Sequence, residues 1–150
     1  CDHIQDPHNL GALIRSAETA GASAVMIPKR GGCPPTGTVV KTSAGAALRV
    51  PVAKVGNISQ AIKMLQNENF WVVGLAMEGK ESLFKADMPG RLVLVIGAEG
   101  EGLGTAVSKS CDELRRIPMD GSVGSLNASV AAALGMFEWV RSQKRIDENR

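Results

Sequence analysis

An uninterrupted apolar run at residues 92–96, LVLVI, ends in a glycine-rich stretch at residues 97–102, GAEGEG. A β-branched run of this length bounded by glycine predicts a strand that is buried on both faces of a parallel sheet. The glycines allow a ligand to approach the backbone closely. Because open α/β sheets bind ligands beyond the carboxyl ends of their strands, the sequence predicts a binding loop at this point.

Two carboxylates in this loop restrict the kind of ligand. Glu99 and Glu101 would repel a phosphate, and no lysine follows them as in a phosphate-binding loop. The glycine order G-x-x-G-x-G also differs from the dinucleotide fingerprint and from the P-loop. The loop favours a cationic ligand or one without phosphate. A tight turn with solvated acids is the alternative, and the loop by itself does not decide between the two.

Strand and helix patterns alternate along the chain. Strands are expected at residues 24–28, 49–55, 70–76, 92–96 and 114–119, with a strand remnant at residues 1–4. Helices are expected at residues 9–20, 38–47, 57–67, 105–111 and 126–145. This order predicts an α/β fold with a mainly parallel sheet flanked by helices on both faces. A length of 150 residues matches one domain over residues 1–150.

The composition argues against several classes of protein. An aromatic content of 3% without tyrosine does not suit a base-stacking RNA platform. The aromatic residues are expected in the core: Phe70, Trp71, Phe84, Phe137 and Trp139. No apolar segment approaches the length of a membrane span. The net charge of +2 leaves a nucleic-acid partner open.

The three cysteines, Cys1, Cys33 and Cys111, are far apart and form no C-x-x-C pair. Their spacing indicates neither a zinc site nor a disulfide framework, which suits a reducing compartment. We therefore expect no metal.

A second segment of interest, residues 6–15, opens the first expected helix. Asn9 is suited to cap this helix, and Gly11 permits close approach at its first turn. Arg15 borders the apolar face of the helix and needs a carboxylate, a phosphate or a route to solvent. A structural salt bridge is the ordinary alternative for this arginine.

A third segment, residues 117–129, crowds small and hydroxyl residues into a turn between a strand and the last helix. Its backbone amides and carbonyls would be available to a ligand. A capped helix after a long turn explains the same pattern equally well.

Together the three segments resemble motifs of the SpoU, or TrmH-like, family of RNA ribose 2′-O-methyltransferases in the SPOUT superfamily. The matching elements are D-P-x-N-x-G-x-x-x-R at residues 6–15, G-A-E-G-x-G at residues 97–102, and I-P-M to S-L-N-x-S at residues 117–129. They occur in the family's order and extend over nearly the whole chain. Within the family, the sequence is most similar to bacterial enzymes that methylate a guanosine of 23S ribosomal RNA.

The resemblance implies features that the patterns alone do not show. It implies a C-terminal trefoil knot, S-adenosylmethionine as the cofactor and S-adenosylhomocysteine as the product. It also implies an RNA substrate, with ribosomal RNA favoured over transfer RNA, a homodimer whose sites borrow groups across the interface, and a cytoplasmic location. Larger family members carry an N-terminal RNA-recognition domain, which we expect ahead of residue 1.

The resemblance also implies two groups of site residues. The cofactor-binding residues are Leu75, Ala76, Gly97, Glu99, Gly102, Ile117, Met119, Ser125 and Leu126. The catalytic residues are Arg15, Asn9, Glu99, Asn127 and Ser125. Because a guanidinium almost never loses its proton, Arg15 is expected to orient the ribose or phosphate and to stabilise oxyanion charge. Glu99 either takes part in catalysis or braces the loop.

Histidine is the side chain that ordinarily changes charge near neutral pH, so His3 and His8 invite a general-base role. The family motif requires histidine at neither position, so capping or surface positions are expected.

Other functions stay open from sequence alone: a transfer-RNA methyltransferase, a catalytically silent RNA-binding module, and an unrelated nucleotide-binding protein. The presence of Asn9, Arg15, Glu99 and Asn127 favours an enzyme over a silent module.

Overall fold

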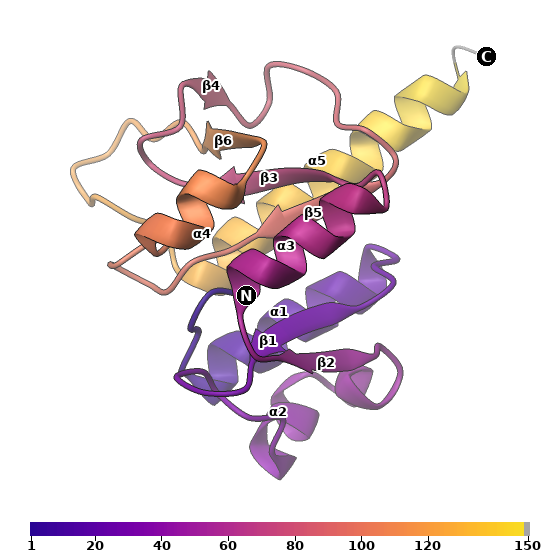
Figure 1. The fold of residues 1–150 in the computed structure, drawn as a ribbon, viewed down its shortest axis with the longest axis vertical. Helices are drawn as coiled ribbons and strands as arrows, with labels where there is room; N and C mark the ends of the chain where they lie inside the picture. Colours follow the sequence, from indigo (N-terminus) through magenta and orange to yellow (C-terminus); the bar gives the residue numbers. More distant parts are fainter. Residues whose placement is uncertain (149–150) are drawn as a thin grey trace.

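The computed structural model describes residues 1–148 and has the predicted alternation of strands and helices (Figure 1). The helices are α1 (Pro7–Thr19), α2 (Gly37–Thr42), the 3₁₀ turn η1 (Ala46–Leu48), α3 (Ile58–Asn67), α4 (Thr105–Ser110) and α5 (Ala128–Glu148). The strands are β1 (Val25–Pro28), β2 (Val52–Val55), β3 (Trp71–Leu75), β4 (Glu81–Ser82), β5 (Leu92–Val95) and β6 (Glu113–Arg116). The short strand β4 was not predicted.

The helix predicted at residues 38–47 is divided into α2 and η1. Ala44 and Gly45 separate the two parts, with φ angles of 52° and 79°. These left-handed conformations cannot continue an α-helix.

All strand pairs in the named sheets are parallel, as predicted. The strands form two hydrogen-bonded groups, however, with the orders β4-β6-β3-β5 and β1-β2, where a single sheet was expected. The predicted strand remnant at residues 1–4 lies between the groups. The Asp2 amide donates to the Ile96 carbonyl at 2.7 Å, and the terminal ammonium of Cys1 donates to the Met26 carbonyl at 2.9 Å. The remnant therefore contacts the edge of each group.

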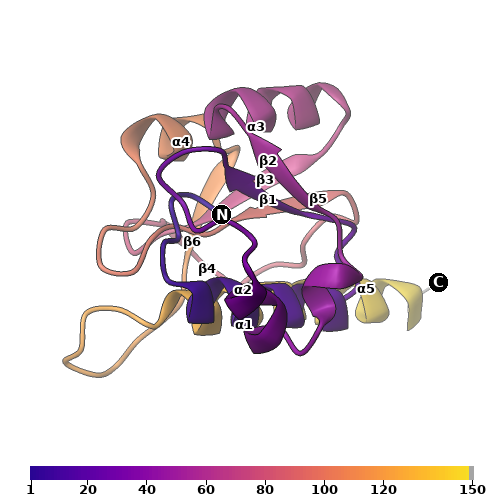
Figure 2. The same ribbon diagram turned by 90° about the horizontal axis from the view of Figure 1, so that it is seen from below.

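Helices cover both faces of the strand layer, which confirms the prediction (Figure 2). Helices α3 and α4 pack together on one face, and α1, α2 and α5 lie on the other. The trefoil knot expected from the resemblance stays a prediction.

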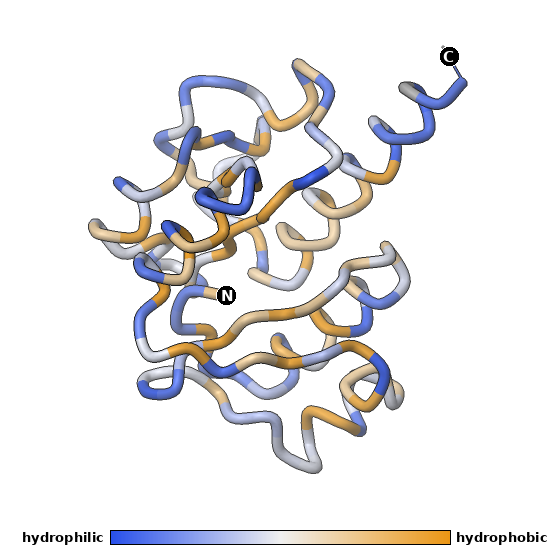
Figure 3. Tube along the Cα trace, turned by 45° about the vertical axis from the view of Figure 1, so that its right-hand side comes forward, coloured by the Kyte–Doolittle hydropathy of each residue, from blue (hydrophilic) through white to orange (hydrophobic). Residues whose placement is uncertain are grey.

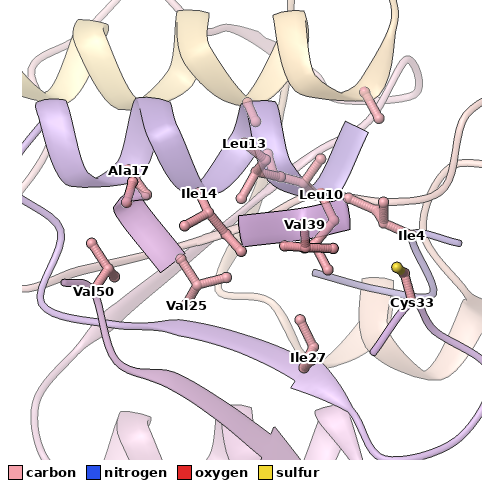
Figure 4. Packing of buried hydrophobic residues seen from close by; sticks show 14 of the residues in the cluster. Ile4, Leu10, Leu13, Ile14, Ala17, Val25, Ile27, Cys33, Val39 and Val50 are labelled. Atoms are coloured by element: carbon pink, nitrogen blue, oxygen red, sulfur yellow. The ribbon is translucent and has the colours of Figure 1, made fainter. Parts of the chain in front are cut away.

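The core follows the periodicity of α1. Its residues Leu10, Leu13, Ile14 and Ala17 share one helix face and are buried against β1 and α2 (Figure 4). A smaller buried cluster joins α3 and α4 to the other face of the sheet: Ile62, Val72, Val95 and Val107. The hydrophobic residues accordingly lie along the strands and on the inner faces of the helices (Figure 3). Full burial of each large aliphatic side chain contributes about 1.5–3 kcal/mol.

Three aromatic residues expected in the core are instead exposed. The exposed fractions are 44% for Trp71, 48% for Phe84 and 45% for Phe137. Trp71 lies at the start of β3, where its indole Nε1 donates to the Glu113 carboxylate at 3.3 Å. The apolar run at residues 92–96 is also less buried than predicted, because full burial begins only at Val95.

No helix within residues 1–148 combines the length and the apolar character that crossing a bilayer requires. All three cysteines are free.

Candidate functional site

The predicted binding loop, residues 97–102, folds back on itself at the carboxyl end of β5; we call it the glycine loop. Ala98 and Gly102 form an antiparallel bridge, and the Gly102 amide donates to the Ala98 carbonyl at 2.9 Å. Gly100 and Gly102 have φ angles of 80° and 67°, which favour glycine. A Cβ atom on Gly97 would lie 2.2 Å from the carbonyl carbon and oxygen of Gly102. Glycine at position 97 therefore permits the two arms of the loop to touch.

The glycine loop forms one wall of a pocket beyond the carboxyl ends of β3, β5 and β6, which we call the loop pocket. The other walls come from residues 75–78 after β3, from residues after β6, and from the start of α5. The nine predicted cofactor-binding residues all line it: Leu75, Ala76, Gly97, Glu99, Gly102, Ile117, Met119, Ser125 and Leu126. The fold thus gathers around one cavity residues from four separate segments, at the place where parallel sheets bind ligands.

The charges in the loop pocket are all negative. Its lining residues all lie within the described part of the chain. They include Glu78, Glu99 and Glu101 but no lysine, arginine or histidine. Glu78 was not predicted, because the turn after β3 carries no recognisable motif. A pocket of this charge disfavours phosphate groups and attracts cations.

Three of the five predicted catalytic residues form a hydrogen-bonded chain beside the loop pocket. Asn127 Nδ2 donates to Asn9 Oδ1 at 2.8 Å, and Asn9 Nδ2 donates to Glu99 Oε2 at 3.4 Å. Asn127 Oδ1 also accepts from the Ser129 amide at 2.9 Å. The side chain of Asn127 therefore caps α5 and is held toward Asn9 at the same time.

Of two local predictions for residues 6–15, the one that Asn9 caps the helix was wrong, and the one that Gly11 permits a close approach is confirmed. The cap of α1 is Asp6, whose carboxylate accepts from the His8 amide at 2.9 Å, with Pro7 at the first helical position. Asn9 is thus free to join the hydrogen-bonded chain. Gly11 does allow a close approach, but it is the approach of α2: a Cβ there would lie 1.8 Å from Thr42 Oγ1.

The remaining two predicted catalytic residues differ in their positions. Ser125 lines the loop pocket. Arg15 is exposed on α1, does not line the pocket, and its guanidinium has no hydrogen-bond or salt-bridge partner among residues 1–148. The structural salt bridge considered for Arg15 is therefore not formed with any described residue.

The sequence did not lead us to expect an apolar groove next to Arg15. Its lining comes from α1, α5 and the segment after β4: Ala12, Ser16, Phe84, Ser129, Val130, Ala133, Leu134, Phe137, Glu138 and Arg141. Val130, Leu134 and Phe137 are exposed. Their spacing of four and three residues marks an apolar stripe on α5. This spacing is the sequence signal that could have indicated the groove. A buried apolar stripe on the same helix gives a similar pattern, so the spacing alone does not distinguish a groove from the core.

Other kinds of chemistry have little support in the described residues. No group of three or more His, Cys, Asp or Glu side chains there is placed to hold a metal ion. Burial raises the pKa of the Cys111 thiol to about 11, so this sulfur is not a thiolate nucleophile at neutral pH. His3 Nδ1 lies 2.6 Å from the Asp2 carboxylate and does not line the loop pocket.

Sequence comparison gives a consistent set of relatives. The profile described as "SpoU rRNA Methylase family" matches residues 1–137. The chain is 49% identical over 142 residues to "23S rRNA (guanosine-2'-O-)-methyltransferase RlmB" of Salmonella typhi and of Escherichia coli (strain K12). Each alignment covers 95% of this chain but 58% of the relative, so the chain spans less than two thirds of these relatives.

Solved structures share the fold. The SpoU methyltransferase AviRb from Streptomyces viridochromogenes, in complex with AdoMet, superimposes with a TM-score of 0.88 at 29% identity, over 96% of this chain and 59% of that one. The AdoMet-bound rRNA methyltransferase from Sinorhizobium meliloti gives a TM-score of 0.84 at 29% identity, over 93% of this chain and 54% of that one.

Proposed function

This chain belongs to the SpoU rRNA Methylase family, and from that premise we propose that it transfers a methyl group from S-adenosylmethionine to a ribose 2′-hydroxyl of RNA. The observation that carries the proposal is the loop pocket, acidic and beside the chain of Asn9, Glu99 and Asn127. The names of the relatives at 49% identity favour a guanosine of 23S ribosomal RNA as substrate. A substrate in ribosomal RNA favours a cytoplasmic location.

The residues of the loop pocket fit this cofactor. S-adenosylmethionine carries a sulfonium, an ammonium and one carboxylate, so its net charge is positive, and the charged side chains of the pocket are all carboxylates. The apolar residues Leu75, Ile117 and Leu126 offer contacts for an adenine ring, while the glycine loop offers backbone groups. When bound, the sulfonium supplies an activated methyl group, so the protein chiefly has to align the acceptor.

The hydrogen-bonded chain supplies the alignment. Asn127 is fixed by its cap on α5 and in turn fixes Asn9, so both amides have defined positions before RNA arrives. Such preorganised donors and acceptors hold a ribose hydroxyl without further ordering cost. Glu99, exposed and bonded to Asn9, either contacts the substrate or keeps the glycine loop in place.

We propose that the apolar groove is the contact with a second copy of this chain. A groove with exposed Phe84, Val130, Leu134 and Phe137 presents apolar area that a monomer leaves in water. Arg15 lies on the same exposed side of α1 as the groove residues Ala12 and Ser16. A second copy seated in the groove thus comes within reach of a guanidinium that has no partner among the described residues of its own chain. We propose that Arg15 serves the loop pocket of the partner.

The experiment that tests the function combines binding with product mapping. Calorimetry measures binding of S-adenosylmethionine by the purified chain. Incubation with ribosomal and transfer RNA, followed by mass spectrometry, locates 2′-O-methyl groups. We expect binding and a methylated guanosine in 23S RNA. Methylation of transfer RNA alone would show that the chain is a transfer-RNA methyltransferase. Binding of RNA without cofactor would indicate a silent module, and stronger binding of ATP or NAD would indicate a nucleotide-binding protein.

Mixed dimers test whether Arg15 acts across the interface. An Arg15→Ala chain is combined with a Gly97→Ala chain, whose loop pocket is disrupted; each is expected to transfer poorly as a homodimer. If Arg15 serves its partner, the mixed dimer has one complete site and regains up to about half of the activity of one fully active dimer. If Arg15 serves its own chain, no site is complete and activity stays at background.

A further inference from the structure

Asp2 is a buried acid that the proposed mechanism does not use. Only 2% of its surface is exposed. Its Oδ2 accepts from the Gly104 amide at 2.7 Å, and its Oδ1 lies 2.6 Å from His3 Nδ1. Its own amide donates to the Ile96 carbonyl at 2.7 Å, and it pairs with Gly97 as a parallel bridge.

These contacts join the two ends of the glycine loop. The backbone enters the loop through Ile96 and Gly97 and leaves it through Gly104. Asp2 bonds to both sides, by main chain on entry and by side chain on exit. Gly104 precedes α4 and makes no capping bond of its own, so the carboxylate of Asp2 sets the position of this amide.

The same N-terminal segment also reaches the tip of the loop. Asn9 Nδ2 bonds Glu99 Oε2, seven residues along the chain from Asp2. Between the two residues the segment is fixed, because Ile4 is buried and its carbonyl accepts from the Cys33 amide at 2.8 Å. One anchored stretch of chain, residues 2–9, therefore bonds both the base and the tip of the glycine loop.

We propose that Asp2 is a positioning residue of the loop pocket, which holds the two ends of the glycine loop at the separation that cofactor binding requires. This inference rests on the proposed function. Removing the carboxylate leaves the Gly104 amide without its acceptor and frees the exit of the loop. Such a loss weakens the ligand contacts made by the loop, while the alignment of Asn9 and Asn127 is kept.

Asp112 provides a control that is matched in its hydrogen bonds, on a residue that is exposed. Its Oδ2 accepts from the Val72 amide at 2.7 Å, and its own amide donates to the Val72 carbonyl at 2.9 Å, so it makes the same kind of contact. Asp112 precedes β6 and does not line the loop pocket. Asp112→Ala therefore reports what such a contact contributes to stability alone.

The test measures the dissociation constant of S-adenosylmethionine, kcat at saturating cofactor, and amide hydrogen exchange in the intact chain. We expect Asp2→Ala to raise the dissociation constant about tenfold, the effect of losing one hydrogen bond to a charged group, with kcat within about twofold of the unsubstituted chain. Asp2→Asn keeps an acceptor oxygen and should recover most of the affinity. Asp112→Ala should lower the melting temperature without changing the dissociation constant.

Hydrogen exchange separates this inference from the proposed function. Faster exchange at residues 97–104 in Asp2→Ala, and not in Asp112→Ala, supports the proposal that Asp2 holds the two ends of the glycine loop. Unchanged exchange and an unchanged dissociation constant in a folded Asp2→Ala protein would overturn it. If the unsubstituted chain binds no S-adenosylmethionine, the proposed function fails and the role of Asp2 in cofactor binding fails with it, whatever the exchange shows. If Asp2→Ala does not fold, hydrogen exchange in Asp2→Asn decides: its neutral oxygen accepts from the Gly104 amide less strongly, so exchange at residues 97–104 should be faster than in the unsubstituted chain, and unchanged exchange would overturn the inference.

Discussion

The loop pocket and the apolar groove lie on either side of the first turns of α5 and are built in opposite ways. Ala128 and Ala131 line the pocket, whereas Val130 and Leu134 line the groove. The pocket is shaped largely by main chain: a glycine loop, two further strand-end segments and a helix start. The groove is shaped by side chains, most of them on helices α1 and α5. Substitutions should therefore act on the pocket through backbone geometry and on the groove through association.

The largest effect is expected at the point where the pocket depends most on main chain. Gly97→Ala places a Cβ 2.2 Å from the carbonyl carbon and oxygen of Gly102, and main-chain atoms cannot move aside as a side chain would. We expect the two arms to separate and cofactor affinity to fall at least about 100-fold, as measured by calorimetry. Gly121→Ala is the control, because no atom lies within 4 Å of its added Cβ. Equal affinity of both variants would show that the loop is not the pocket wall we describe.

Arg15→Ala separates cofactor binding from transfer. We expect the rate of methyl transfer to fall about 100- to 1000-fold, because a charged group that stabilises the transition state is lost. Cofactor affinity should stay close to that of the unsubstituted chain, since Arg15 is expected to orient the ribose or phosphate of the RNA and not to hold the cofactor. Arg49→Ala is a control on another exposed arginine, which lies 3.5 Å from Glu18. Retained activity in Arg15→Ala would remove this residue from the site.

Phe137→Glu tests the groove without touching the pocket. A carboxylate in an apolar contact must be desolvated, so we expect the dimer dissociation constant to rise at least about 30-fold in sedimentation experiments. Transfer should fall in parallel at low protein concentration. Met64→Glu changes another exposed apolar residue, on α3 at the opposite face, and should leave the dimer intact. An unchanged dimer in Phe137→Glu would place the interface elsewhere.

The smallest effect is expected at Asn127, which caps α5 between the residues that line the pocket and those that line the groove, and itself lines neither. Asn127→Ala removes the helix cap and should lower the free energy of unfolding by about 1 kcal/mol. Asn127→Ser keeps a capping oxygen and should retain most of that stability, while losing the bond to Asn9. Denaturant unfolding together with transfer rates distinguishes the two roles. A rate that follows stability in both variants would argue against an aligning role for Asn127.

Much of the fold was predictable because it depends on local patterns. The periodicity of α1 identified its buried face, and the alternation of elements identified the parallel α/β arrangement. The exposure of the aromatic residues was less predictable. A phenylalanine in the core and an exposed one are identical in sequence, and only the packing around Phe84 and Phe137 decides that both are exposed. The cap of α1 had a local signal, since Pro7 at the first helical position places the cap at Asp6, whereas the contact of Asn9 with Asn127 depends on the tertiary structure.

For the site, the sequence by itself determined the strand, the glycine loop and the three motifs, because each is a local arrangement of residue types. Only the tertiary structure brought the motifs together: Asn9 meets Glu99 and Asn127, and Asp2 closes the loop at Gly104. It also left Arg15 outside the pocket of its own chain. The physical reason is that periodicity and capping act over a few residues. Contacts between residues about a hundred positions apart depend on how the whole sheet and its helices pack.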